Sequence, residues 1–488
     1  MNKRIKNWIG LMLTAALLAA GSVSVGAYIA YDNYNYSNRD RTLIPAPDAY
    51  LPERVVYGHS LGTAGLNAPE DVFAAADGGL YVLDSGNARI LELDGRATTL
   101  KRVITAQVEG TAAFAGAKGL FVTADGDIYV ADTEQSRVVV LDKAGGVKRV
   151  YLAPESEILA EDFIFKPTKI TVDADGTMYI VSDGTFEGII TMDAAGEFSG
   201  FIGANPVTVT PWDIFWRSIA TRAQKDARVQ FVPVDHTSLD IDKDGFIYCT
   251  TKTAQNGKSV KRLSPGGDDV LRDTANVPIV GDPGMYWFGI RKGMTTFMDI
   301  AQHPSGIYAC LDVTRGKIFC YNNDGYQLYL FGALGVSDGA FKAPVALTYS
   351  GDRVAVLDRE RGSLTLFAPT AYATLINEAT ALQTDLRLEE AGEKWERVLV
   401  QNEGFELAHI ATGKLAMTAG DYKAAMKKFE LGSNKALYSK ALGEYRTEWI
   451  YRNIGWVLFV AIVLIAAFLA YSLTRKRRKK QSKGGGAA

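Results

Sequence analysis

Cysteine and histidine are scarce in this chain of 488 residues, which contains three and four of them respectively. Small oxidised domains carry a denser and even set of cysteines, and zinc sites require closely spaced Cys and His ligands. The sequence also lacks a glycine-rich phosphate loop and the nucleophile elbow of hydrolases. These absences argue against a disulfide scaffold, a zinc enzyme, a nucleotide-binding enzyme and a hydrolase of the nucleophile-elbow type.

Two of the cysteines, Cys310 and Cys320, lie on the two strands of one expected hairpin. If Asp312 pairs with Lys317, then Cys310 faces Phe319, and Cys320 points to the opposite side of the sheet. A disulfide between them is therefore not expected. All three cysteines, including Cys249, are predicted to be small buried side chains.

Charged residues are missing from residues 8–30 and 454–473. Each stretch is long enough to cross a bilayer as a helix, which takes about 20 residues. Basic residues precede the first stretch and follow the second, so they lie between each stretch and the nearer chain terminus. Positive charge marks the cytoplasmic side of a membrane span. We therefore expect a cytoplasmic N-terminus at 1–7, a transmembrane helix or signal anchor at 8–30, a transmembrane helix at 453–473 and a basic cytoplasmic tail at 474–488. A cleaved signal peptide is the alternative for the first span.

Positive charge is also depleted between the two spans. Ten of the 53 Lys and Arg residues lie in the two basic flanks, so the remainder carries 43 basic against 55 acidic residues. A negative ectodomain repels polyanions, which makes nucleic acid a poor partner. Membrane topology and attraction to anionic lipid explain the basic tail, so the bilayer is an expected partner.

What is present between residues 54 and 370 is one pattern repeated six times. An apolar alternating run leads into a tight turn, a second run ends in a polar residue, and a third run follows. Six such sheets packed radially form a mainly β, six-bladed propeller. Residues 31–53 are expected to be a linker. The turn glycines that mark the repeats are Gly78, Gly126, Gly176, Gly245, Gly306 and Gly351.

Two of the repeats carry a family signature. Residues 84–90 (DSGNARI) and 132–138 (DTEQSRV) resemble the signature of the NHL-repeat family. Their Asp and Arg residues are expected to fix turns by hydrogen bonding. Residues 55–57 match the outer strand of a repeat, so we expect them to complete blade six and close the ring non-covalently.

After residue 370 the apolar period changes from that of strands to that of helices. A large, a small and an aromatic residue recur at the period of about 34 residues that is typical of tetratricopeptide (TPR) repeats. Residues 371–452 thus resemble a TPR module, either a rigid stalk, which we favour, or a peptide-binding groove. A last helix at 436–451 should cap the module and run into the membrane span. The expected packing residues are Leu388, Ala391, Trp395, Tyr422, Ala425 and Phe429.

Three charged residues at the start of alternate inner strands, Asp71, Lys169 and Asp299, should converge on the propeller axis. They could hold a small cation or a polyol, or form a self-neutralised cluster at the channel mouth. His236 lies where propeller lyases place a base, but one His without an aligned acid is weak support for catalysis. Gluconolactonase-type enzymes need Glu, Asn and Asp around a metal. Glu70 is the only Glu near a blade entrance, and no Asn accompanies it at the aligned positions. We therefore predict no catalytic residue, metal or cofactor.

Two insertions concentrate aromatic residues outside the repeat pattern. They lie near 206–230 and 278–294. Such residues are typical of protein contact sites, although they could also pack against the propeller. The candidate contact residues are Trp212, Phe215, Trp216, Tyr286, Trp287 and Phe288.

The combination of an NHL propeller, a TPR pair and terminal membrane helices resembles a group of bacterial, chiefly Gram-positive, membrane proteins. That resemblance implies a link to carbohydrate ABC-transporter loci and to Yip-type membrane proteins, and it implies no catalysis. We expect a non-catalytic, extracytoplasmic scaffold or sensor tethered to the cell membrane that binds a protein partner. The alternatives are a metal-dependent lactonase or lyase in the propeller channel, and a sugar or cation sensor. The partner and the oligomeric state stay open.

The basic flanks generate a prediction about topology. In a cysteine-free variant, a Ser482→Cys substitution should resist a membrane-impermeant maleimide in intact cells, whereas Ser60→Cys should react. Labelling is read on a gel, and permeabilised cells, in which both positions should react, serve as the control. Labelling of position 482 in intact cells would contradict the proposed orientation.

Overall fold

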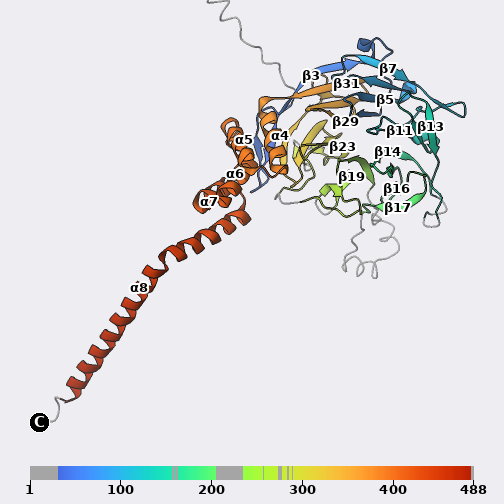
Figure 1. Cartoon of the computed structure of the whole chain (residues 1–488). Coiled ribbons are helices and arrows are strands. Elements are labelled where there is room, and N and C mark those ends of the chain that lie inside the picture. The colour runs from blue at the N-terminus through green and yellow to red at the C-terminus, as the bar shows by residue number, and fades with distance from the viewer. Residues whose placement is uncertain are drawn as a thin grey trace, which may run out of the picture.

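The computed structural model describes residues 31–156, 159, 163–204, 235–255, 258–272, 277–282, 285–287 and 290–484. Six antiparallel sheets stand around a common axis, as expected from the repeats (Figure 1). The innermost strand of each sheet contacts the innermost strand of the next, and the sixth contacts the first. The fold is therefore a closed six-bladed propeller.

Strands are given from the axis outward. Blade one consists of β4 (Asp71–Ala74), β5 (Leu80–Asp84), β6 (Arg89–Leu93) and β7 (Leu100–Ile104). Blade two consists of β10 (Gly119–Val122), β11 (Ile128–Asp132), β12 (Arg137–Leu141) and β13 (Val147–Tyr151). Blade three consists of β14 (Pro167–Val172), β15 (Met178–Ser182), β16 (Ile189–Met192) and β17 (Phe198–Ile202). Blade four consists of β18 (His236–Ile241), β19 (Ile247–Gln255) and β20 (Lys258–Leu263). Blade five consists of β23 (Phe297–His303), β24 (Ile307–Asp312), β25 (Lys317–Asn322) and β26 (Gln327–Phe331). Blade six consists of β29 (Pro344–Ser350), β30 (Arg353–Asp358), β31 (Ser363–Pro369) and β3 (Tyr50–Tyr57).

Short elements occupy the connections between strands. They are the 3-10 turns η1 (Gly58–Leu61), η2 (Ser85–Asn87) and η3 (Thr133–Gln135), and the strand pairs β8 (Gln107–Val108) with β9 (Thr111–Ala112), β21 (Met285–Trp287) with β22 (Ile290–Lys292), and β27 (Ala333–Leu334) with β28 (Ala340–Phe341). Blade four has three strands within the described residues, and a single bridge between Leu263 and Asp269 stands where a fourth would run.

The first turn of every blade requires a positive φ angle. Gly78 has φ 80° and Gly126 has φ 93°, and the equivalent glycines of the other four blades are also positive. Side chains other than glycine rarely adopt this conformation. The repeat glycines are thus explained by hairpin geometry, as predicted.

The repeated Asp and Arg residues fix the second turn, as expected. The Arg89 Nε lies 2.7 Å from Asp84, and the Arg137 Nε lies 2.8 Å from Asp132. Asp84 also accepts a hydrogen bond from the backbone N–H of Asn67. Asp84 thus satisfies buried donors around its turn, whereas the Asp132 Oδ1 and the Arg137 Nη2 are buried without a hydrogen-bond partner among the described residues.

Blade six is closed by a strand from the N-terminal side of the domain, as predicted. Strand β3 pairs antiparallel with β31, and the register runs from Tyr50 opposite Pro369 to Tyr57 opposite Ser363. The ring is therefore closed by hydrogen bonds and side-chain packing between distant parts of the chain.

Residues 31–53 do not form the expected linker. Strands β1 (Tyr34–Tyr36) and β2 (Leu43–Pro45) pair as a hairpin beside β26. The Asn35 amide donates to the Leu328 carbonyl at 3.1 Å, and the Asn38 backbone N–H donates to Glu406 at 2.6 Å. The segment is ordered because its polar side chains and backbone find partners on both the propeller and the helices.

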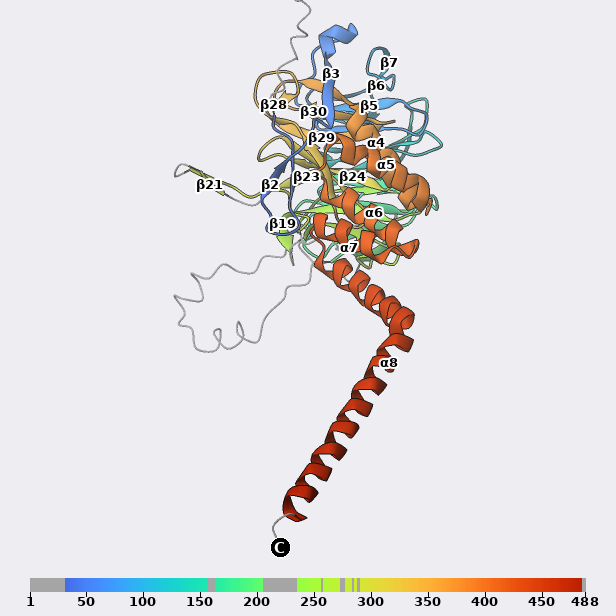
Figure 2. The ribbon, with the colours of Figure 1, turned by 90° about the vertical axis from the view of Figure 1, so that its left-hand side faces the viewer.

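Four helices, called the helical module below, pack against the outer edges of blades five and six (Figure 2). They are α4 (Ala371–Thr384), α5 (Leu388–Gln401), α6 (Glu406–Thr418) and α7 (Tyr422–Leu431). Asn377 of α4 accepts a hydrogen bond from the Tyr329 hydroxyl at 2.6 Å and donates to the Tyr50 hydroxyl at 3.2 Å. One continuous buried cluster includes Tyr50, Phe331, Ile376 and Trp395. Helices and propeller therefore share a core.

Four of the six residues expected to pack inside the helical module are buried. They are Ala391, Trp395, Ala425 and Phe429. Leu388 is a correction, since its side chain is 46% exposed. It is the first residue of α5, where no preceding helical turn covers it, and Tyr422, the first residue of α7, is only partly buried.

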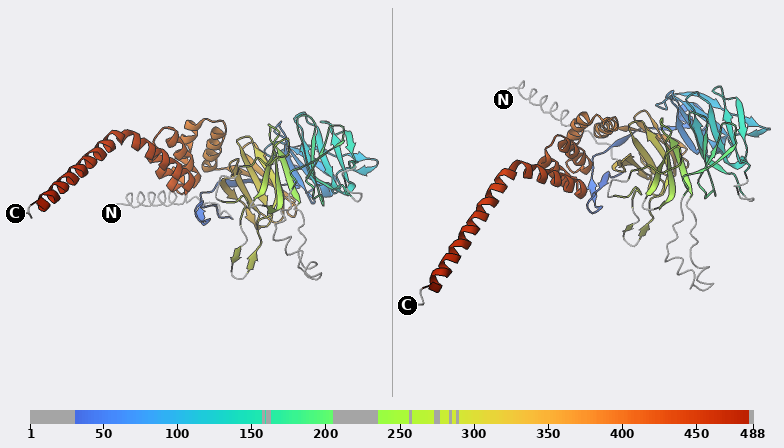
Figure 3. Two further views of the ribbon diagram at one scale, coloured as in Figure 1. Left: turned by 90° about the horizontal axis from the view of Figure 1, so that it is seen from below. Right: turned by 60° about the horizontal axis from the view of Figure 1, so that its bottom comes forward.

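The last helix, α8 (Lys435–Gly484), leaves the helical module and extends far from the propeller (Figures 1 and 3). It is long and apolar enough to cross a membrane, and the apolar window is not buried in the rest of the chain. The helix that begins as the cap of the module is continuous with this segment, as predicted. The second expected span, residues 8–30, lies outside the described residues.

The cysteines match their predicted environments. Cys310 stands opposite Phe319, Asp312 stands opposite Lys317, and all three cysteines are buried without a disulfide. Cys310 and Cys320 belong to different buried clusters on opposite faces of the sheet. Burial raises the pKa of the Cys320 thiol to about 12, so this thiol is unreactive.

The difference between Trp395 and Leu388 gives a prediction for stability. The buried Trp395→Ala substitution should lower the free energy of unfolding by about 3–5 kcal/mol through loss of packing and an unfilled cavity. Leu388→Ala, at a half-exposed site, should cost about 1 kcal/mol or less. Denaturant unfolding of the detergent-solubilised protein measures both. Equal losses would show that the helical module packs differently.

Candidate functional site

The inner strands begin at one end of the propeller channel, and four of them carry a bulge there. Strands β14, β18, β23 and β29 each shift register one residue into the strand. Bulges commonly re-aim side chains beside functional sites. Here the extra residues, Thr168, Thr237, Met298 and Val345, all line the channel entrance.

This entrance is a cavity of about 550 Å³, called the mouth cavity below, to which all six blades contribute. Its volume lies within the range of about 300–1,000 Å³ that is usual for small-molecule sites. Its charged or titratable side chains are Glu70, Lys118, Lys169, Asp183, Asp235, His236, Lys252, Lys342 and Arg359.

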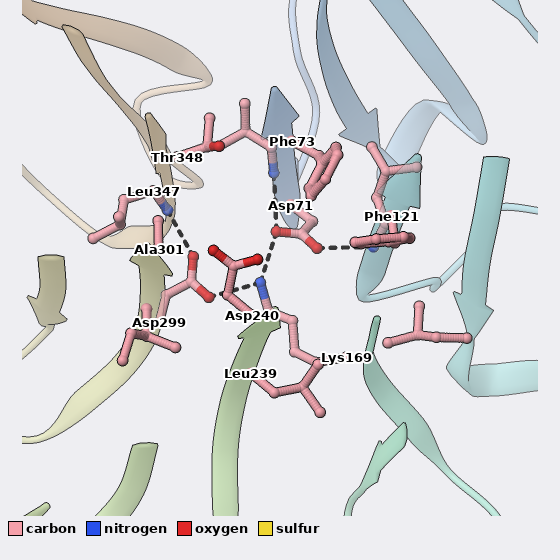
Figure 4. A pocket seen from close by; sticks show the side chains of 14 residues that line it. Asp71, Phe73, Phe121, Lys169, Leu239, Asp240, Asp299, Ala301, Leu347 and Thr348 are labelled. Carbon is pink, nitrogen blue, oxygen red and sulfur yellow. Dashed lines mark hydrogen bonds and ion pairs between the residues drawn. The ribbon is translucent and has the colours of Figure 1, made fainter. Parts of the chain in front are cut away.

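The floor of the mouth cavity is an ion cluster on the propeller axis (Figure 4). The Lys169 ammonium lies 2.6 Å from Asp71 and 2.9 Å from Asp299. These three residues, the axial cluster, come from blades three, one and five. The predicted convergence of alternate blades is confirmed.

The remaining carboxylate oxygens of the axial cluster bind the neighbouring blades. Asp71 accepts from the backbone N–H of Leu120 at 2.8 Å, and Asp299 accepts from that of Leu347 at 2.7 Å. The Ser238 hydroxyl also donates to Asp299 at 2.5 Å. All four oxygens therefore have partners, and the cluster is the self-neutralised alternative rather than an open cation or polyol site.

Gly119 makes the position of Lys169 possible. A Cβ on Gly119 would lie 2.6 Å from the Thr168 carbonyl oxygen and 2.9 Å from the Cα of Lys169. Real Cβ atoms do not approach backbone that closely, so a side chain here would push the third blade outward. The aligned position in blade two is glycine because Lys169 enters the axis beside it.

Asp240 is a fourth axial acid that the sequence comparison of blades missed. It lies two residues after the aligned Ser238, and strand alternation places both on one face of β18. Its carboxylate accepts from the backbone N–H of Gln302 at 2.8 Å and from that of Ile241 at 2.9 Å. Asp240 would have been found by considering every second residue of each inner strand instead of one aligned position per blade.

Burial governs protonation at the axis. Burial raises the pKa of Asp240 to about 7, against the two backbone donors that favour the ionised form. Burial also raises the pKa of Asp71 to about 6, although Lys169 acts in the opposite direction. Burial alone would lower the pKa of Lys169. The charges of Asp299 and Asp71 outweigh the effect of burial and raise the pKa of Lys169 above its usual value. The ammonium therefore stays charged.

Beneath the axial cluster lies a small cavity of about 30 Å³. It is large enough for a water molecule but not for an organic ligand. Phe73, Phe121 and Leu347 contribute to its walls (Figure 4). Space for a ligand lies above the cluster, in the mouth cavity.

His236 lines the mouth cavity but is poorly suited to act as a base. Its Nε2 lies 3.1 Å from the Gly203 carbonyl oxygen, which can only accept, so Nε2 carries the proton. Its Nδ1 is buried and has no hydrogen-bond partner among the described residues. Burial, helped by Lys261, lowers the pKa of His236 to about 4, so the ring is neutral near pH 7.

The arrangement gives little support to hydrolytic chemistry. Glu70, the acid considered for a gluconolactonase-type site, is paired with Arg359. Within the part of the chain that the structure describes, no three His, Cys, Asp or Glu side chains are placed to hold one metal ion. The axial acids and lysine are committed to each other and to the backbone.

The aromatic insertions are only partly described. Trp212, Phe215, Trp216 and Phe288 lie outside the described residues. Tyr286 and Trp287 belong to β21, and the hairpin of β21 and β22 projects from the propeller body (Figures 2 and 3). The expected loop near 278–294 is therefore a projecting hairpin.

Asp282 anchors the base of that hairpin. Its carboxylate accepts from the Tyr34 hydroxyl at 2.5 Å and the Tyr36 hydroxyl at 2.7 Å, and it pairs with Lys317 at 2.9 Å. Burial acts to raise the pKa of Asp282, but Lys317 and the tyrosine hydroxyls outweigh it and lower the pKa. The N-terminal hairpin, blade five and the projecting hairpin meet at this ionised side chain.

Comparisons with known proteins find only distant structural similarity. No family model and no curated protein matches the chain. A streptogramin B lyase structure aligns at 14% identity with a TM-score of 0.40, covering 66% of this chain and 100% of the lyase. Virginiamycin B lyase from Staphylococcus aureus aligns at 11% identity with a TM-score of 0.39, covering 67% and 84%. Kuenenia stuttgartiensis hydrazine synthase aligns at 15% identity with a TM-score of 0.38, covering 63% and 97%.

The axial cluster makes a prediction for stability and its pH dependence. Lys169→Met should lower the free energy of unfolding by about 3–5 kcal/mol at pH 8, because two buried carboxylates lose their counter-charge. Burial raises the pKa of Asp71 and Lys169 opposes that rise, so without Lys169 the folded-state pKa of Asp71 lies further above its unfolded value. The variant should therefore recover stability as the pH falls through that raised pKa towards 5.

Denaturant unfolding at both pH values measures this effect. Lys148→Met is the matched control, because Lys148 pairs with Asp127 on the surface and such pairs contribute about 0–1 kcal/mol. Adding Asp71→Asn and Asp299→Asn to Lys169→Met should restore part of the loss. A small, pH-independent effect of Lys169→Met would contradict the paired, buried state described above.

Proposed function

We propose that this protein is a non-catalytic, membrane-tethered scaffold that holds a β-propeller at a fixed position outside the membrane for binding to a protein partner. The observation that carries the proposal is the shared core of blades five and six with the helical module, which continues through α8 into the apolar segment. A tether built in this way keeps the propeller at the membrane and also fixes its position there.

Several contacts favour a rigid rather than a hinged tether. Tyr50 of β3 stacks on Phe331 of β26 with ring centroids 4.8 Å apart, and both contribute to the cluster that contains α4 and α5. Thr370 caps α4 immediately after the last propeller strand, so no free linker separates the two parts. The stalk interpretation of residues 371–452 follows from this junction better than that of an independent groove.

The family assignment extends the proposal. The repeat signatures favour membership of the NHL group, and the spacing of Ala391, Trp395, Ala425 and Phe429 favours a TPR-like module. The basic flanks favour cytoplasmic termini with the propeller outside the cell membrane. The family resemblance favours a role as an accessory to a membrane protein, such as a carbohydrate ABC transporter.

The projecting hairpin of β21 and β22 is the proposed partner-binding element. Asp282 holds its base through charged hydrogen bonds, which are among the strongest available to a protein. A rigid hairpin loses less conformational entropy on binding than a mobile loop does. Its sequence carries Tyr286 and Trp287, residue types that are enriched at interaction hot spots.

Photo-crosslinking in native membranes tests the proposal. Trp287→p-benzoylphenylalanine should give a discrete adduct with another membrane or extracytoplasmic protein, because the hairpin carries the contact. The adduct is identified by mass spectrometry, and Asp282→Ala in the same background should reduce its yield severalfold by releasing the base of the hairpin.

The matched control is the same photo-reactive residue at Val147, a half-exposed position on the outer strand of blade two. An adduct common to both positions would indicate random collision. The absence of any adduct specific to position 287 would overturn the proposal that this hairpin binds a partner.

A further inference from the structure

The mouth cavity contains hydrogen-bond acceptors that nothing in the described structure satisfies. The Asp235 Oδ1 and the His236 Nδ1 are both buried and lack a partner among the described residues, and both residues line the cavity. A buried acceptor without a donor is unfavourable. Such atoms retain that cost unless a donor arrives from outside.

These acceptors lie on one wall. Asp235 and His236 stand at the start of blade four, and Asp183 follows the second strand of blade three in the same cavity. Lys252 on this wall partly offsets the two acids and opposes the rise in the pKa of Asp235 that burial causes. Two carboxylates, Asp183 and Asp235, beside the buried ring of His236, form a site for an N–H-bearing cation.

The opposite wall is basic. The order of inner strands around the ring places blades six and two on either side of blade one, across the axis from blade four. Blade six contributes Lys342 and Arg359 to the cavity, and blade two contributes Lys118. Among the described side chains, Arg359 is paired with Glu70, and Lys342 is paired with the exposed Glu360 at 3.4 Å. Lys342 and Lys118 are thus available to an anion.

We propose that the mouth cavity binds a zwitterion with separated charges, namely a short linear peptide with free ends. Its α-ammonium group lies against Asp235, Asp183 and His236, and its carboxylate lies against Lys342 and Lys118. This inference does not depend on the tethering role, since the cavity belongs to the propeller alone.

The size and the floor of the cavity agree with this class of ligand. A volume of about 550 Å³ accommodates several residues but exceeds what a single ion needs. Lys169 is neutralised from below by Asp71 and Asp299, so the floor does not compete for either end of the ligand. A metal ion is a poorer occupant, because the acids and His236 of this wall are not placed to share one.

Isothermal titration calorimetry of the full chain in detergent tests the proposal with alanine peptides of two to five residues. At least one length should bind with its ends free. Acetylation of its amino end and amidation of its carboxyl end should each weaken binding by about tenfold or more, the loss expected for a hydrogen-bonded charge.

Two variants assign the ends. Asp235→Asn should weaken the free peptide but leave the affinity of the acetylated peptide almost unchanged, and Lys342→Gln should do the same for the amidated peptide. Asp125→Asn, in an exposed turn at the far end of blade two, is the matched control and should change neither. Absence of binding at every length, equal affinity for blocked and free peptides, or equal effects of Asp235→Asn and Asp125→Asn would overturn the proposal.

Discussion

The buried ion pairs of Lys169 with Asp71 and Asp299 are the constraint on which the rest of the propeller depends. Inner strands of neighbouring blades do not pair with one another, so their backbone donors face the axis and need acceptors. Asp71, Asp240 and Asp299 supply these acceptors to the next blade, and Lys169 supplies counter-charge. The cluster stands on the axis below the mouth cavity, so the space for a ligand described above lies at one end of the propeller.

The outside of the ring also has two different sides. Blades one to three present outer edges free of the helical module, whereas blades five and six are covered by α4 and by the hairpin of β1 and β2. The covered side carries the tether and the Asp282 anchor together. Polar partners such as Asn377 and Glu406 fix the orientation there, and aromatic packing supplies most of the apolar contact.

Much of this architecture was predictable from local rules. Turn glycines, alternating apolar runs and the outer strand at residues 55–57 led to six blades and their closure, because hairpins impose strict local conformations. The convergence of Asp71, Lys169 and Asp299 followed from the repeat register. Asp240 and Asp235 were missed since they stand off the aligned position, and the packing of residues 31–53 depends on contacts with segments hundreds of residues away, which local patterns do not encode.

Closure of blade six by β3 has a consequence for biosynthesis. The ribosome makes β3 first among the propeller strands, yet its partner β31 is the last to appear. Until β31 has been made, β3 has an unpaired edge, and the first and sixth blades cannot meet. Every nascent or prematurely terminated chain that stops short of Ser363 therefore exposes an open ring to chaperones and proteases.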